Sequence, residues 1–66
     1  MKPEKFLRRS DVCAATGLPV STLYALMQRG EFPRPVRTSP GRVGWLESEI
    51  TVWQQARISE RDGMAA

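Results

Sequence analysis

Apolar residues recur at the three- and four-residue spacing of an α-helix between Val20 and Arg29, and this pattern predicts a short amphipathic helix. The apolar stripe consists of Val20, Leu23, Leu26 and Met27. The opposite side carries small and polar residues, namely Ser21, Thr22, Ala25 and Gln28, with Arg29 at its end. Gly30 is expected to end the helix, and Phe32 to fold back onto the stripe. One face of this helix is therefore expected to close a core, which leaves the polar face free.

A preceding helix is predicted over residues 10–16. Ser10 is expected to be its N-cap, because a serine hydroxyl can accept a hydrogen bond from a free backbone N–H, and Gly17 is expected to stop it. Only Gly17, Leu18 and Pro19 then separate the two helices. Two helices joined by so short a turn are typical of the helix-turn-helix unit.

A hairpin is predicted after the helix pair. Ser39, Pro40, Gly41 and Arg42 suit a type II turn, because proline fixes φ at the second position and glycine supplies a positive φ at the third. Val36 before the turn is expected to pair across it with the segment around Val43 and Trp45. Pro33 and Pro35 lack the N–H that a central strand needs, so the first strand is expected at an edge.

The two ends of the chain complete the predicted fold. Phe6 and Leu7 are expected to form an extended piece packed on the core, and a third helix is predicted at about residues 47–60, with Ile50 and Trp53 turned inward. The predicted fold class is α+β, mostly α: a small winged helix-turn-helix with three helices and a two-stranded β-hairpin wing. The expected organisation is a flexible N-terminus over residues 1–5, one domain over residues 6–60, and a disordered tail over residues 61–66.

Composition narrows the class of function. The chain has 66 residues, which is enough for one small core but not for a catalytic cleft of the usual few hundred cubic ångströms. It has no histidine and a single cysteine, Cys13, which excludes an internal disulfide and leaves no metal-ligand cluster. We therefore expect a binding protein and not an enzyme, without metal, cofactor or small-molecule substrate. The sequence has neither a membrane-spanning apolar run nor a signal peptide, which predicts a cytoplasmic protein with no membrane partner.

Charge is unevenly distributed along the chain. Residues 1–46 carry eight lysines and arginines against three acidic residues, a net charge of +5, whereas residues 47–66 carry two against four, a net charge of −2. A basic body with an acidic end is typical of a protein that presents one face to a polyanion. Surface arginines are also common in proteins that bind no polyanion, so charge alone decides little.

The free face of the helix at residues 20–29 has the chemistry of a DNA-reading helix. A major groove about 12 Å wide admits one helix, and small side chains allow a close approach. Ser21 and Thr22 can donate to phosphate oxygens, Gln28 can pair with adenine, and Arg29 can pair with guanine. Other roles are open: Ser21 as an N-cap, Thr22 bonded to a backbone carbonyl, and Tyr24 as a half-buried aromatic.

The hairpin offers a second set of contacts. Arg37 and Arg42 flank its tip, with Thr38 beside them, so these residues are expected to contact the DNA backbone or enter the minor groove. Solvated charges that protect an exposed strand edge are the alternative. Arg8, Arg9 and Arg34 give a weaker signal, and each is compatible with a plain surface charge.

The order of these segments resembles the AlpA family of small phage and prophage regulators, part of the MerR-like winged helix-turn-helix group that also includes excisionases. The resemblance covers about Phe6 to Arg57, and its most specific marks are "TGL…STLY", "GEFPRPV" and "VGWLESE". It implies a recognition helix beginning near Val20, a wing at residues 36–45, and double-stranded DNA as the partner. The contacts that it implies are Ser21, Thr22, Tyr24 and Gln28 on the helix and Arg37 and Arg42 on the wing, with Trp45 and Trp53 in the core.

Family members activate integrase genes or act as directionality factors in prophage excision, and the sequence does not choose between these roles. Many relatives carry Ser, Arg and a basic residue where this chain has Pro19, Val20 and Ala25. Because fewer cations then face the DNA, we expect several copies to bind cooperatively on repeated sites. The competing hypothesis is a protein-interaction module with an exposed apolar patch of Tyr24, Met27 and Phe32.

Overall fold

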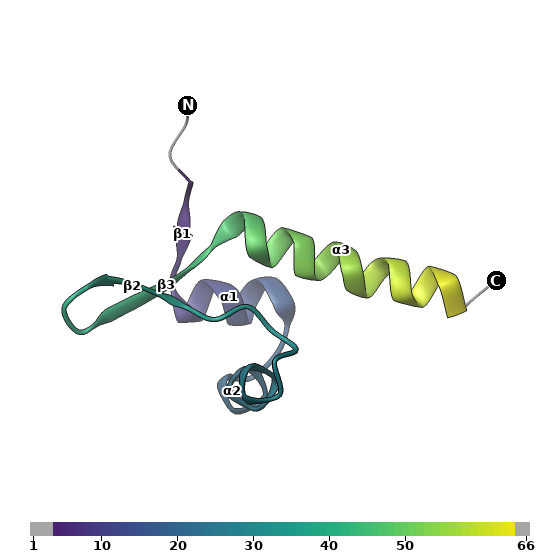
Figure 1. Cartoon of the computed structure of the whole chain (residues 1–66), viewed down its shortest axis with the longest axis horizontal. Coiled ribbons are helices and arrows are strands. Elements are labelled where there is room, and N and C mark those ends of the chain that lie inside the picture. Colours follow the sequence, from purple (N-terminus) through teal and green to yellow (C-terminus); the bar gives the residue numbers. More distant parts are fainter. Residues whose placement is uncertain (1–3, 65–66) are drawn as a thin grey trace.

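The computed structural model describes residues 4–64 and contains three helices and three short strands (Figure 1). Their order is β1 (Phe6–Leu7), α1 (Arg9–Thr16), α2 (Val20–Gln28), β2 (Val36–Ser39), β3 (Arg42–Leu46) and α3 (Glu47–Met64). The hairpin of β2 and β3 and the C-terminal part of α3 project in opposite directions from the helix pair. The predicted mostly helical α+β fold is confirmed, and across the described residues none of the helices is both long and apolar enough to cross a membrane.

Helix α1 begins earlier than the sequence predicts. Its N-cap is Arg8, not Ser10, and the backbone N–H of Arg8 donates to Asp11 Oδ2 at 3.2 Å. The Asp11 carboxylate thus accepts from a backbone N–H that has no partner within the helix. Its negative charge in the first turn also interacts favourably with the helix dipole. The predicted end is confirmed: Gly17 has φ 73°, and its N–H donates to the Cys13 carbonyl at 2.8 Å.

Helix α2 has the predicted extent. Pro19 is its N-cap, and the Pro19 carbonyl accepts from the N–H groups of Thr22 and Leu23, each at 3.1 Å. At the other end Gly30 has φ 72°, and its N–H donates to the Met27 carbonyl at 3.1 Å. A glycine therefore ends each helix of the pair, as the sequence predicts.

The sheet has one strand more than predicted. Its order is β1-β3-β2, all antiparallel, so β2 is an edge strand, as predicted from the two prolines that precede it. The additional strand is β1, which pairs Phe6 with Leu46 and Leu7 with Trp45. A strand of two residues is too short to produce a recognisable alternation in the sequence. β1 can approach β3 closely because Gly44 of β3 has no side chain; a Cβ there would lie 3.3 Å from the Leu7 carbonyl oxygen.

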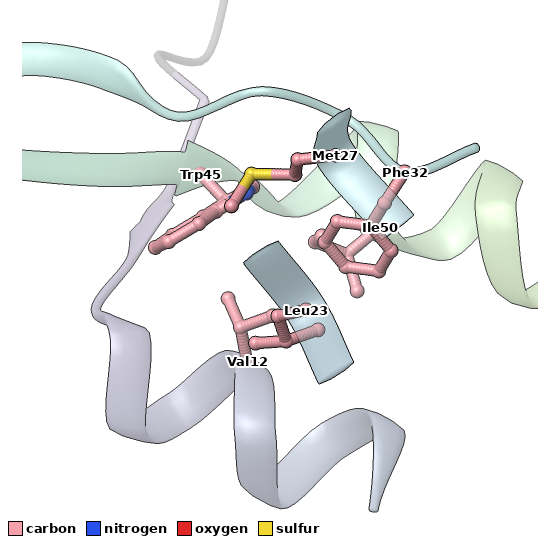
Figure 2. Close-up of a cluster of buried hydrophobic side chains, with 6 residues drawn as sticks. All are labelled: Val12, Leu23, Met27, Phe32, Trp45 and Ile50. Atoms are coloured by element: carbon pink, nitrogen blue, oxygen red, sulfur yellow. The ribbon is translucent and has the colours of Figure 1, made fainter. Parts of the chain in front are cut away.

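One apolar cluster joins all three helices to the sheet (Figure 2). Its buried members are Val12, Leu23, Met27, Phe32, Trp45 and Ile50. The predicted return of Phe32 onto the stripe of α2 is confirmed, as is the inward direction of Ile50. Val20, which the periodicity places in the stripe, is instead 38% exposed, because it lies in the first turn of α2, on the flank of the buried stripe.

Two tryptophans hold the segment between α2 and β2. The indole N–H of Trp45 donates to the Pro33 carbonyl, and that of Trp53 donates to the Glu31 carbonyl, each at 2.9 Å. Between these two bonds the Phe32 ring meets the Trp53 ring edge to face, with centroids 4.9 Å apart. These two hydrogen bonds fix the segment from α2 to the hairpin on either side of the buried Phe32.

The described secondary structure extends beyond residue 60, the predicted end of the domain. Helix α3 continues to Met64, so residues 61–64 are helical and not part of a disordered tail, and residues 65–66 lie outside the described part. The ion pair between Arg57 and Glu60, one turn apart, supports a last stretch that lacks an apolar pattern. Residues 1–3 of the predicted flexible N-terminus also lie outside the described part, while the Lys5 carbonyl accepts from the N–H of Glu47 at 2.9 Å.

Candidate nucleic-acid interface

The exposed face of α2 brings together three of the predicted contact residues. Ser21, Tyr24 and Gln28 are exposed and follow one another at the helical spacing of three and four residues. Ser21 and Gln28 lie opposite the buried Leu23, and Tyr24 lies at the edge of this face, next to Met27. Thr22 is half-buried and lies at the flank of this face, not at its centre. The structure thus places Ser21, Tyr24 and Gln28 together and sets Thr22 aside.

The polar groups of this face are not used by the described part of the protein. Ser21 is not an N-cap, because that position belongs to Pro19. Among the described residues, the side chains of Ser21, Thr22, Tyr24 and Gln28 make no hydrogen bond to the rest of the chain. The neighbouring helix α1 uses a polar side chain differently: Thr16 donates to the Val12 carbonyl at 2.8 Å. The face of α2 is therefore available to bond an external partner.

Arg29 is the exception among the predicted contacts of α2. It is the C-cap residue, and its Nη2 lies 2.7 Å from Glu31 Oε2. Both side chains are exposed, so the pair contributes little to stability and a phosphate can displace the carboxylate. In the free protein, however, the charge of Arg29 is already compensated.

The register of the hairpin separates its two arginines. Arg37 lies opposite Val43 in the hairpin, so the two side chains are on the same side of the sheet. Because Val43 comes two residues before Trp45, this is the side that packs on the helices. Arg42 is the neighbour of Val43 and therefore points to the other side. Between them the irregularity at Thr38 brings its methyl group over Gly44. The hairpin thus presents one guanidinium on each face.

The arginines of the chain differ in whether the fold compensates their charge. In α3 both arginines are paired within the helix, Arg57 with Glu60 at 3.0 Å and Arg61 with Asp62 at 3.1 Å. Within residues 4–64 no ion pair engages the arginines at the start of α1, before β2 and in the hairpin, namely Arg8, Arg9, Arg34, Arg37 and Arg42. The basic body of the sequence is therefore a set of available charges, whereas α3 compensates its own.

The sequence does not predict that Arg8 and Arg34 lie beside the candidate interface. Arg34 borders a hollow that Tyr24 and Gln28 also line, so it lies next to the exposed face of α2. Arg8 borders a groove across the sheet that Arg42 also lines. Of the two, only Arg34 has a more specific sequence feature, because it stands between two prolines that stiffen the segment leading from α2 to the hairpin.

The apolar patch of the competing hypothesis is absent as formulated. Met27 is 6% exposed and Phe32 is 5% exposed, because both belong to the core, and only Tyr24 of the three is at the surface. Residues 4–64 contain no group of three or more His, Cys, Asp or Glu side chains that could hold a metal ion.

Three helices, a short turn between the first two, and a hairpin beside them make this a small protein of winged-helix-like architecture. Residues 5–58 match the family model described as prophage CP4-57 regulatory protein (AlpA), and the chain belongs to this family of phage regulatory proteins. The uncharacterized protein ORF88 of Enterobacteria phage P4 is 45% identical over 58 residues, which cover 88% of this chain and 66% of that protein. The chain thus accounts for slightly less than two thirds of the length of that relative, and the family resemblance inferred from the sequence is confirmed.

Proposed function

We propose that the protein is a sequence-specific double-stranded DNA-binding regulator of a phage or prophage. The observation that carries the proposal is the exposed polar face of α2, beside arginines of the neighbouring segment and hairpin that no ion pair engages within residues 4–64. Membership of a family of phage regulatory proteins supports the same role. The proposed activity is binding, with no catalytic step.

In the proposed complex α2 lies along the major groove with its exposed face toward the DNA. Ser21 donates to a phosphate oxygen, Tyr24 and Thr22 lie along the groove wall, and Gln28 forms a bidentate pair with adenine N6 and N7. The positive end of the α2 dipole adds to the attraction, since Pro19 leaves the first backbone N–H groups of the helix without a side-chain acceptor. Base recognition is assigned to Gln28, and Arg29 reaches the DNA by exchanging Glu31 for a phosphate or a guanine.

The hairpin makes the second contact of the proposed complex. With Arg37 and Arg42 on opposite faces, a hairpin lying along the minor groove reaches the phosphates of both strands. Thr38 at the irregularity adds a hydroxyl donor between them. These contacts position the protein and carry no base preference of their own.

Two regulatory roles fit this binding mode. The protein either controls transcription of integrase or excision genes, or acts as an excisionase, and in both roles several copies bind repeated sites cooperatively. A single module buries only about 600–1,000 Å² on DNA, which favours assembly of more than one copy.

The test compares two variants on a preferred duplex and on all its single-base substitutions. Gln28→Ala is expected to flatten the preference at one base pair, worth about 1–3 kcal/mol, because only that bidentate contact is lost. Arg42→Ala is expected to weaken binding to every duplex by a similar factor, because a phosphate contact is independent of sequence. Competition by fluorescence anisotropy measures both. If Gln28→Ala lowers affinity equally for every duplex, α2 is not the recognition helix.

A further inference from the structure

A shallow hollow lies between the last turns of α2 and the segment that leads to β2. It has a volume of about 230 Å³ and is lined by Tyr24, Met27, Gln28, Arg34 and Pro35. Tyr24 is 40% exposed and Pro35 is half-buried, while Met27 contributes the small part of its surface that the core leaves open. The hollow is therefore an apolar depression that opens beside the polar face of α2.

The amide and the guanidinium at the hollow are both available. Gln28 and Arg34 are exposed, and among the described residues neither side chain has a hydrogen-bond or ion-pair partner. None of the residues that line the hollow is acidic, so its walls do not repel an anionic ligand. An apolar depression bordered by an amide and a guanidinium fits a ligand with an apolar edge, an adjacent donor–acceptor pair and a nearby negative charge.

Thymine next to adenine in duplex DNA has this combination. The thymine C5-methyl group is the apolar feature that the major groove displays, and adenine offers the N6 and N7 groups that a glutamine recognises. The backbone phosphate supplies the charge. The hollow lies on the flank of the face that the proposed function turns toward the groove, so a base that meets Gln28 has its neighbours close to Tyr24 and Pro35.

We propose that this hollow binds a thymine C5-methyl group in the major groove, with Tyr24 and Pro35 as its walls, while Gln28 contacts an adenine and Arg34 a phosphate. The inference rests on the proposed DNA binding and adds a specificity determinant to it. It assigns Tyr24 to apolar recognition of a base, and it brings Arg34 into the interface, where sequence patterns alone do not place it.

Replacement of thymine by uracil tests the proposal on the wild-type protein. Uracil keeps every base-pairing group and lacks only the methyl group. Each thymine of a preferred duplex, obtained by selection from a randomised pool, is replaced singly by uracil, and affinity is measured by competition anisotropy. At one position we expect a loss of about fourfold, the factor that corresponds to roughly 0.8 kcal/mol for one buried methyl or methylene group.

Two variants show where that methyl group is bound. Tyr24→Ala removes a wall of the hollow and is expected to bind the thymine and uracil duplexes equally. Ser21→Ala serves for comparison and lies one turn earlier on the same face. It is expected to weaken binding to both duplexes by the same factor, because its proposed partner is a phosphate, and so to keep the fourfold difference. A methyl group packed on the exposed Ala25 instead would keep its effect in Tyr24→Ala, and that result would overturn the assignment.

The two proposals fail in different ways. If the wild-type protein selects particular duplexes but no uracil substitution changes its affinity, the hollow does not bind thymine and the proposed function stands. If no duplex is preferred over any other, the proposed function itself is wrong. Circular dichroism melting of each variant establishes that a loss of discrimination is not a loss of folding.

Discussion

Arg29 and Arg34 carry the same side chain five positions apart, yet the fold gives them different electrostatic environments. Arg29 ends α2 beside Glu31, 2.7 Å away, whereas Arg34 borders the hollow at the exposed face of α2 and has no ion pair within residues 4–64. A phosphate that binds Arg29 must first replace a carboxylate, so part of its attraction offsets the lost pair. Arg34 has no such cost.

We therefore expect Arg34→Ala to weaken DNA binding more than Arg29→Ala. The loss should be similar for all sequences, and the slope of log K against log salt should decrease in magnitude by about 1 for Arg34→Ala. Titrations of one duplex at several salt concentrations measure both quantities. Equal losses and equal slopes for the two variants would contradict the assignment.

Truncation of a side chain is expected to affect the free energy of unfolding differently on the two faces of α2. Leu23 is fully buried among Val12, Trp45 and the rest of the core, so Leu23→Ala is expected to lower the free energy of unfolding by about 2–5 kcal/mol. Ser21→Ala, two residues away and exposed, is expected to change it by no more than about 0.5 kcal/mol. Urea denaturation followed by tryptophan fluorescence measures both values. A large effect of Ser21→Ala would show that this face has a structural role.

At the scale of elements, two glycines at or within helices have different conformational requirements. Gly17 has φ 73°, and a Cβ added there would meet no described atom within 4 Å, so Gly17→Ala meets only backbone strain and is expected to cost about 1–2 kcal/mol. Gly63 is the next-to-last residue of α3, also in open space but without a positive φ, so Gly63→Ala is expected to stabilise by less than about 1 kcal/mol, the value for a helix interior. Thermal unfolding of the two variants gives the comparison. A stabilising Gly17→Ala would mean that α1 does not end in a left-handed residue.

The elements that the sequence predicts well are those with local causes. Helix α2, the stop at Gly17 and the hairpin follow from periodicity and from glycine or proline at specific positions. Strand β1 has no local cause: Phe6 and Leu7 become a strand only because Leu46 and Trp45 lie opposite them. The extension of α3 to Met64 is missed for the related reason that its last turns have no apolar pattern.

The candidate site likewise has features that the sequence predicts and features that it does not. The polar face of α2 follows from the helical period, which places Ser21 and Gln28 on the side opposite Leu23. The separation of Arg37 from Arg42 requires the register of the hairpin, which the turn alone does not reveal, since Thr38 interrupts the pairing. The ion pair that compensates the charge of Arg29, and the lack of such a pair at Arg34 within residues 4–64, depend on contacts that form only in the folded protein.

At the scale of the whole molecule, the charge asymmetry of the sequence becomes an arrangement in space. The arginines that lack an ion pair within residues 4–64 lie on the α1 start, the segment before β2 and the hairpin, whereas both arginines of α3 are paired within that helix. The hairpin and the C-terminal part of α3 project in opposite directions (Figure 1). The surface proposed to meet DNA is thus basic, and the acidic helix points away from the hairpin. About four to six phosphate contacts per copy predict a salt slope of about −4 to −5.

So few phosphate contacts predict weak binding by one copy, and we expect several copies to bind cooperatively. On a duplex with two preferred sites, the second copy is expected to bind more tightly than the first, giving an isotherm steeper than that of a one-site duplex. Gel-shift titrations of duplexes with one and two sites measure the difference. Independent binding at the two sites would contradict the cooperative part of the proposal.

The central claim is that the exposed face of α2 recognises a base sequence, and selection of bound duplexes from a randomised pool at two salt concentrations tests it most directly. We expect a short motif, repeated at a regular spacing, that persists at the higher salt concentration, because base contacts survive when phosphate attraction is screened. Recovery of nothing beyond the input pool at either salt concentration would contradict the claim and leave the basic surface without a sequence-specific role.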